Sequence, residues 1–291
     1  MILHTDWKTK LGYLQVSFAA LIWGSYGLCV RALDYPPENI LFFRFLFGFL
    51  GLLFYTLIKD GTAWIKPSMT YWKLMLLPAL LAGLSWMAYT YSINYTSVSN
   101  AAFLIYTAPV FTVIFAPLVL KERIEIRTLV ALVFSLLGTT AIMGFNSLFS
   151  SETSLLGDVI ALFGGIAYGF MSLFLKRIPT SMLGLPSNII LSGYISLALL
   201  PFALFSMRQL TSNGLLLLLV LGLVQQSFAA SMFHIGLRSI KAQHAGILTY
   251  IEPLAATAMA ALFLYEGITF GSILGGALII TSGLIVVARR V

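Results

Sequence analysis

Ten apolar stretches, each long enough to cross a lipid bilayer, follow one another along this chain. They lie near residues 11–33, 37–58, 72–94, 98–120, 127–146, 155–176, 186–206, 214–237, 242–264 and 268–288. A helix rises about 1.5 Å per residue, so about 20 apolar residues cross a hydrocarbon core of about 30 Å. The stretches are continuous rather than alternating apolar and polar, which argues against membrane strands. The pattern predicts an all-α membrane protein with ten transmembrane helices.

Charged residues are too scarce for a water-facing surface. Of 291 residues, 9% are Asp, Glu, Lys or Arg and 59% are hydrophobic, whereas a soluble domain carries about 25% charged residues. Lipid is therefore expected to be the main solvent of this chain. Cys29 is the single cysteine, so no intrachain disulfide can form.

The basic residues predict the orientation in the membrane. With the N-terminus placed in the cytoplasm, two basic residues fall outside, Arg31 and Arg208. The basic residues that fall inside are Lys8, Lys10, Lys59, Lys66, Lys73, Lys121, Arg123, Arg127, Lys176, Arg177, Arg238, Lys241, Arg289 and Arg290. Such a bias sets the topology of membrane proteins. We expect a multi-pass protein of the cell inner (cytoplasmic) membrane with both termini cytoplasmic, and no nucleic-acid-binding surface.

The second half of the chain repeats the first. The segment from Leu11 to Arg31 aligns without a gap on the segment from Leu156 to Lys176, at a spacing of 145. Residues 101–109 align on residues 245–253 at a spacing of 144, and Glu122 then aligns on Glu266. A polar turn from Ser147 to Ser154 separates the halves, which we bound at 11–146 and 155–290. Five spans per half is an odd number, so the repeats are inverted, as in many secondary transporters with midplane substrate sites.

Four motifs, taken in chain order, identify a family resemblance. They are Ala20-Leu21-Ile22-Trp23-Gly24, Phe43-Arg44-Phe45, Tyr106-Thr107-Ala108-Pro109 with Leu120-Lys121-Glu122, and Tyr250-Ile251-Glu252-Pro253 with Leu264-Tyr265-Glu266. With them the chain resembles the EamA-type transporters of the drug/metabolite transporter superfamily, from about residue 11 to 288. The resemblance implies a ten-helix bundle that moves small metabolites, often as an exporter of amino acids and related compounds. It leaves nutrient or cofactor uptake open, since the substrate is not inherited with the fold.

Three ionisable residues, Glu252, His234 and Arg44, stand out inside the predicted spans, where charge is expensive and usually faces protein or water. Glu252 is the leading candidate for binding a substrate ammonium or for binding and releasing a proton. The alternatives for Glu252 are a structural carboxylate paired with Arg44 and a protonated carboxyl group that hydrogen-bonds to backbone freed by Pro253. His234 is a second candidate for proton coupling, against a structural hydrogen-bonded role. Arg44 suits a substrate carboxylate and suits a structural salt bridge equally well.

Aromatic and polar side chains at helical spacings form a predicted cavity wall around Glu252. The predicted substrate-binding residues are Trp23, Tyr26, Trp86, Tyr89, Tyr106, Tyr168, Gln226, Phe233, Tyr250 and Glu252. Such a wall suits an organic ammonium through cation–π contact and charge pairing, or an amino acid with an apolar side chain. Aromatic belts at the membrane interface are the alternative explanation for such residues.

Two matched prolines are candidate hinges. Pro109 and Pro253 fall about midway along their helices, where proline removes a backbone donor and bends the helix. Matched bends suit helices that pivot during alternating access, and a fixed packing bend is the alternative.

No motif predicts an enzyme, a cofactor or a metal site. The expected partners are a small-molecule substrate and the lipid bilayer, with a monomer or weak homodimer as the oligomeric state. Two other classes remain open, a channel and a receptor that binds a ligand without moving it. The inverted repeat favours a secondary transporter over both.

Overall fold

Helices make up every regular element of the part of the chain that the structure describes. The computed structural model describes residues 2–62, 64–92, 94–96, 98–144, 154–265 and 267–288. Within these residues, ten helical spans are long and apolar enough to cross a membrane. The prediction of an all-α membrane protein is therefore confirmed. Glu266, Arg289, Arg290 and the mid-chain turn before Ser154 lie outside the described residues, and so does the end of the first predicted repeat at 146.

The first half contains five spans. They are α1 (Ile2–Trp23) with α2 (Tyr26–Arg31); α3 (Pro37–Asp60); α4 (Ile65–Tyr71) with the 3-10 segment η1 (Trp72–Met75) and α5 (Leu76–Ser92); α6 (Val98–Ile105) with α7 (Ala108–Leu120); and α8 (Ile126–Met143). Two of these spans are interrupted by short breaks that hydropathy did not indicate, at residues 24–25 and 106–107.

The second half contains five more spans. They are α10 (Leu155–Lys176); α11 (Leu185–Phe205); α12 (Ser212–Leu219) with the π-helical segment η2 (Val220–Ala229) and α13 (Ala230–Leu237); α14 (Ala242–Leu248) with α15 (Ile251–Phe263); and α16 (Phe270–Val287). The break between α14 and α15 lies at residues 249–250, one residue from the position that matches the α6–α7 break. In lipid each helix must satisfy its own backbone, so such breaks occur where protein or a cavity surrounds them.

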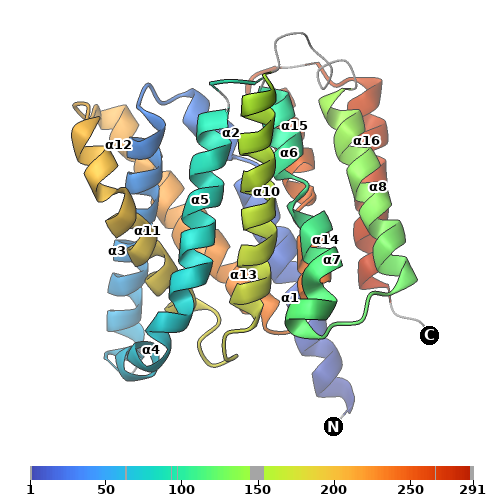
Figure 1. Cartoon of the computed structure of the whole chain (residues 1–291), viewed down its shortest axis with the longest axis horizontal. Helices are drawn as coiled ribbons and strands as arrows, with labels where there is room; N and C mark the ends of the chain where they lie inside the picture. The colour runs from blue at the N-terminus through green and yellow to red at the C-terminus, as the bar shows by residue number, and fades with distance from the viewer. Residues whose placement is uncertain are drawn as a thin grey trace.

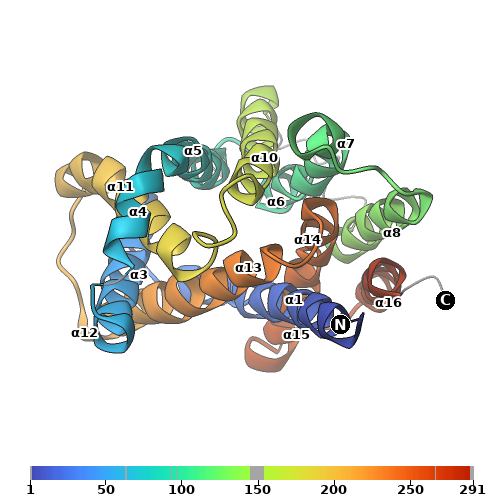
Figure 2. The same cartoon turned by 90° about the horizontal axis from the view of Figure 1, so that it is seen from below.

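The spans stand side by side and alternate in direction, so that the start of α1 and the end of α16 lie at the same face of the bundle (Figure 1). We call this the termini face, and the other end of the bundle the opposite face. Seen from the termini face, α3 and α12 lie toward one end of an elongated bundle, and α8 and α16 toward the other (Figure 2). Five spans per half place the two repeats in opposite orientations, as predicted.

Small residues allow the closest helix contacts between the halves. A Cβ on Gly138 of α8 would lie 2.7 Å from the Gly275 carbonyl of α16. A Cβ on Gly24, at the α1–α2 break, would lie 2.6 Å from the Ala255 Cβ and 2.8 Å from the Ala256 backbone nitrogen of α15. Both distances are shorter than ordinary contacts, so only glycine fits there, as expected for helices that associate by close packing in lipid.

Candidate substrate site

A cavity of about 290 Å³ lies between the two halves of the bundle. Such a volume is at the lower end of the range for small-molecule sites, roughly 300–1,000 Å³. Of the predicted site residues, those that line this cavity are Trp23, Tyr26, Arg44, Trp86, Tyr89, Tyr106, Tyr168, Gln226, Phe233, His234, Glu252 and Pro253. Sequence reasoning therefore located 12 of the 26 described residues that line the cavity, and the prediction that these residues bind substrate stays a prediction.

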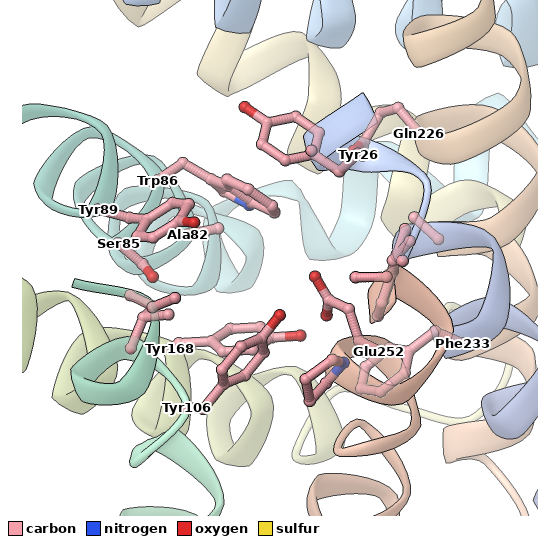
Figure 3. A pocket seen from close by; sticks show the side chains of 18 of the residues that line it. Tyr26, Ala82, Ser85, Trp86, Tyr89, Tyr106, Tyr168, Gln226, Phe233 and Glu252 are labelled. Atoms are coloured by element: carbon pink, nitrogen blue, oxygen red, sulfur yellow. The ribbon is translucent and has the colours of Figure 1, made fainter. Parts of the chain in front are cut away.

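Glu252 lies in the first turn of α15, next to the break in its span. Figure 3 shows its carboxylate directed into the space between Tyr26 and Trp86 on one side and Tyr106 and Tyr168 on the other. The Tyr106 side chain lies on the same wall of the cavity, beside Glu252 (Figure 3). The partial positive charge of a helix N-terminus stabilises a carboxylate in this position. Glu252 is thus a partly buried carboxyl group among the aromatic residues of the cavity.

Arg44 lies in α3 and is held between two aromatic faces. Its guanidinium carbon is 4.2 Å from the ring centre of Trp86 and 4.8 Å from that of Tyr26. Only 1% of the residue is exposed, and its Nε and Nη1 atoms have no hydrogen-bond partner. Among the described residues, no ion pair within 4 Å joins Arg44 to Glu252. The alternative of a direct salt bridge between them is therefore wrong for this conformation.

The two predicted hinges each follow a break in the helix. Pro109 is the second residue of α7 and Pro253 the third of α15, so each lies in a first turn, where a missing N–H is tolerated. At the first break, the Val110 N–H bonds to the Thr107 carbonyl at 2.9 Å, which leaves the Tyr106 carbonyl free. The Tyr250 hydroxyl donates to that carbonyl at 2.7 Å. Whether the chain pivots at these breaks stays a prediction.

Two predicted residues lie away from the wall. Tyr250 has no exposed surface and packs in a second core cluster with Val113, Ile247 and Val286. It is therefore not a wall residue, and its hydroxyl bonds to the Tyr106 carbonyl instead. Pro109 also lies outside the wall.

His234 and Gln226 line the cavity but use their polar atoms between helices. His234 Nδ1 hydrogen-bonds with the Ser187 hydroxyl of α11 at 2.9 Å. The Gln226 amide donates to Asn188 Oδ1 at 2.9 Å and to the Ser192 hydroxyl at 3.0 Å. These contacts agree with the structural alternative for His234, and they show that Gln226 ties η2 to α11.

Sequence reasoning missed part of the wall on α5. Ala82 and Ser85 line the cavity together with Trp86 and Tyr89 (Figure 3). Positions 82, 85, 86 and 89 follow the i, i+3, i+4, i+7 spacing of one helix face. That spacing was available in the sequence, but alanine and serine are too common in membrane helices to stand out.

The cavity is not symmetric between the halves. In the 144-residue register, wall residues Ala102, Ile105, Ile142 and Thr257 correspond to Gly246, Thr249, Val286 and Val113. All four counterparts are buried and none lines the cavity. Because the repeats are inverted, each counterpart lies toward the termini face. The cavity therefore extends toward the opposite face, and its mirror region at the termini face is packed shut. We call Val113, Ile247, Tyr250 and Val286 the inner seal.

Polar contacts between the halves cover the inner seal at the termini face. Lys241 Nζ lies 2.6 Å from Glu125 Oε1, and Arg127 Nε lies 2.5 Å from Glu125 Oε2. The hydrogen bonds from Lys241 and Arg127 hold the pKa of Glu125 well below its usual range, at about 2. Tyr13 of α1 contacts His244 Nδ1 of α14 at 2.6 Å.

Glu122 adds a third link across the same gap. Its Oε1 accepts the Ala242 N–H at 3.1 Å, and its Oε2 accepts from the Gln243 amide at 3.3 Å. Glu122, Glu125, Arg127 and Lys241 form what we call the charged strap. The strap joins the loop before α8 to the loop before α14, and it must separate if the termini face opens.

Comparisons with known proteins agree with this architecture. The model of the EamA-like transporter family matches the chain twice, over residues 10–144 and over residues 155–288. An uncharacterized transporter of Archaeoglobus fulgidus is 28% identical over 276 residues, which cover 95% of this chain and 96% of the relative. The uncharacterized inner membrane transporter YicL of Salmonella typhimurium is 25% identical, with 96% of each chain covered. A crystal structure with 17% identity superposes with a TM-score of 0.79 over 94% of this chain and 96% of that one, which shows the shared fold.

Proposed function

We propose, for a chain that belongs to the EamA-like transporter family, that the central cavity carries a small organic molecule with an ammonium group across the membrane by alternating access. One observation carries the proposal. The cavity extends toward one face, while the symmetry-related region at the other face is packed shut by the inner seal. Two inverted repeats in unequal conformations can exchange those conformations, which moves the opening to the other face.

The ammonium group follows from the chemistry of the wall. Glu252 supplies a carboxylate, and aromatic rings surround it on both sides of the cavity. A cation gains from charge pairing with the carboxylate and from contact with the electron-rich ring faces. The volume of about 290 Å³ restricts the substrate to a metabolite of modest size, such as an amino acid or a small amine.

Proton exchange at Glu252 is the coupling that we propose. One carboxylate can hold an ammonium or a proton, but not both at once. If Glu252 releases the substrate at one face as it takes up a proton, the two move in opposite directions. An inward proton gradient would then drive export. Uptake of a nutrient or cofactor by the same fold is the alternative, with the direction set by the gradients.

The distribution of the basic residues supports an orientation with both termini in the cytoplasm. The membrane is then the cytoplasmic membrane, which is the inner membrane in cells that have two. In this orientation the cavity extends toward the outside. Cysteine labelling of intact cells tests the orientation, with Lys59→Cys on the termini face and Arg208→Cys on the opposite face in a Cys29→Ser background. A membrane-impermeant maleimide is expected to label Arg208→Cys alone.

Counterflow in proteoliposomes tests the transport proposal. Vesicles loaded with an unlabelled amino acid or amine are diluted into a trace of the same labelled compound. Transient uphill accumulation of label is expected from an alternating-access carrier. A channel would give no accumulation, and a receptor would give no flux, so either result would contradict the proposal. An imposed pH gradient then distinguishes two mechanisms. It should drive substrate transport if the carrier exchanges substrate for protons, and it should not drive transport by facilitated diffusion.

A further inference from the structure

Among the described residues that line the cavity, Arg44 is the one arginine or lysine and Glu252 is the one carboxylic acid. They have opposite signs and interact through space, but they do not meet in an ion pair within 4 Å. A ligand in the cavity therefore meets two separate charges rather than one neutralised pair. Both charges act in a poorly solvated space, where electrostatic interactions are stronger than in water.

Aromatic contact accounts for the position of Arg44 but not for its polar atoms. Trp86 and Tyr26 contact the guanidinium at 4.2 and 4.8 Å from their ring centres. The N–H groups of a guanidinium point outward in its own plane, so contact with ring faces leaves their hydrogen-bonding capacity unused. Nε and Nη1 are indeed buried without a partner, which is a costly arrangement for a charged donor.

An ammonium bound at Glu252 is repelled by the charge of Arg44. Two unit charges about 10 Å apart, at an effective dielectric of about 20, change affinity roughly tenfold. A carboxylate on the same ligand reverses this effect, because it is attracted to Arg44 while the ammonium remains at Glu252. The attraction acts through space, so it does not require the carboxylate to displace Trp86 or Tyr26.

We propose that Arg44 makes the cavity selective for zwitterions, molecules with an ammonium and a carboxylate, over amines of the same shape. This inference rests on the proposed function, because it assigns the ammonium to Glu252. Arg44 is then a specificity-determining residue, and the carboxylate of the ligand is its electrostatic partner. A purely structural Arg44 would brace α3 against α2 and α5, and its loss would weaken all ligands alike.

Two matched ligand series test this proposal on the purified full-length protein. The first is L-leucine, isopentylamine and 4-methylpentanoate; the second is L-phenylalanine, phenethylamine and 3-phenylpropanoate. Binding is measured at pH 7 by calorimetry and by thermal stabilisation, which grows with ligand concentration relative to Kd. The variants are Arg44→Gln, which removes the charge, Arg44→Lys, which keeps it, and Glu252→Gln.

For the wild type, the zwitterion of at least one series is expected to bind roughly tenfold more tightly than its amine. In Arg44→Gln the amine should bind more tightly than in the wild type and the zwitterion less tightly, so that the preference disappears. Arg44→Lys should keep the preference. Opposite changes for two ligands cannot come from a folding defect, which would weaken both.

An unchanged preference in Arg44→Gln would overturn the proposal, and so would a wild-type protein that binds the amine as tightly as the zwitterion. The wild-type comparison decides the matter even if Arg44→Gln does not fold. Failure of the underlying function gives a different result. In that case Glu252→Gln would bind both the amine and the zwitterion as the wild type does. If neither the amine nor the zwitterion of either series bound the wild type, both proposals would be contradicted.

Discussion

The hydroxyl of Tyr250 donates a 2.7 Å hydrogen bond to the backbone carbonyl of Tyr106, its counterpart 144 residues earlier in the inverted repeat. The two tyrosines occupy matching positions beside matching helix breaks, but only Tyr106 lines the cavity. Tyr250 belongs to the inner seal. The contact therefore joins the closed side of the bundle to the wall of the open side.

Removing the two hydroxyls should have different effects. Tyr250→Phe removes the partly buried hydrogen bond to the Tyr106 carbonyl, which should destabilise the protein by about 0.5–1.5 kcal/mol. Tyr106→Phe is the matched control, because its hydroxyl faces Glu252 and the cavity. It should change ligand affinity with less effect on stability. Thermal unfolding and ligand titration of both variants check this, and equal loss of stability would contradict it.

Glu252→Gln should leave the protein folded and abolish transport or its response to pH. The amide keeps the shape of the side chain but carries no charge for an ammonium and cannot take up a proton. Counterflow measures the transport, and gel filtration with thermal unfolding measures the folding. Asp34→Asn is the control, since Asp34 is a fully exposed carboxylate at the opposite face. Normal flux in a well-folded Glu252→Gln protein would rule out the proposed role.

Gly24→Ala should destabilise the protein by about 1–3 kcal/mol, because the new methyl group overlaps Ala255 and Ala256 of α15. Gly27→Ala, three residues further on, is the matched control. A Cβ at Gly27 has no atom within 4 Å, and alanine favours the helix by roughly 0.5–1 kcal/mol. Thermal unfolding should thus give changes of opposite sign. A similar loss in both variants would show that the close approach at Gly24 is not specific.

Lys241→Gln should loosen the charged strap and populate a conformation that is open at the termini face. Spin labels at Ile124→Cys and Ser239→Cys, in a Cys29→Ser background, report the distance across the strap by double electron–electron resonance spectroscopy. A second, longer distance is expected in Lys241→Gln and at high salt, since the pair is partly exposed and therefore screened. Lys59→Gln is the control variant. It removes a cation from the same face, but among the described residues Lys59 makes no ion pair between the halves. An unchanged distance in Lys241→Gln would mean that the strap does not hold the closed state.

The contribution of Glu125 to stability should depend on pH in a defined window. Its pKa in the folded protein is about 2, against a usual value of 4.5. A carboxyl with a lowered pKa stabilises the folded state above its unfolded pKa and loses that effect as pH falls through the folded pKa. The difference in unfolding temperature between wild type and Glu125→Gln should therefore be constant from pH 6 to 8 and shrink from about pH 4.5 toward 2. A difference that shrinks near neutral pH would contradict the assignment.

Hydropathy predicted the spans because lipid allows few solutions to the chain. Residues 155–176 and 185–205 are continuous helices within one residue of their predicted bounds. The breaks at residues 24–25 and 249–250 were not predicted, because two small or weakly polar residues, Gly-Ser and Thr-Tyr, do not interrupt the long apolar stretch around them. The tertiary neighbours Gln225 and Tyr106 accept the hydrogen bonds of Trp23 and Tyr250 at these breaks. Periodicity likewise located Trp86, Tyr89 and Phe233 on the wall. It did not indicate that the amide of Gln226 donates hydrogen bonds to α11.

The sequence by itself determined the number of spans, their inverted repetition and the presence of a carboxylate within the ninth span, since each depends on local composition and on register. Only the tertiary structure decided which member of each symmetric pair faces the cavity. Tyr106 lies on the wall and Tyr250 in the seal, although their sequence contexts match. The reason is that two inverted repeats with identical packing would be equally open on both sides. An opening on a single side requires the two copies to pack differently, and that difference depends on contacts between the halves.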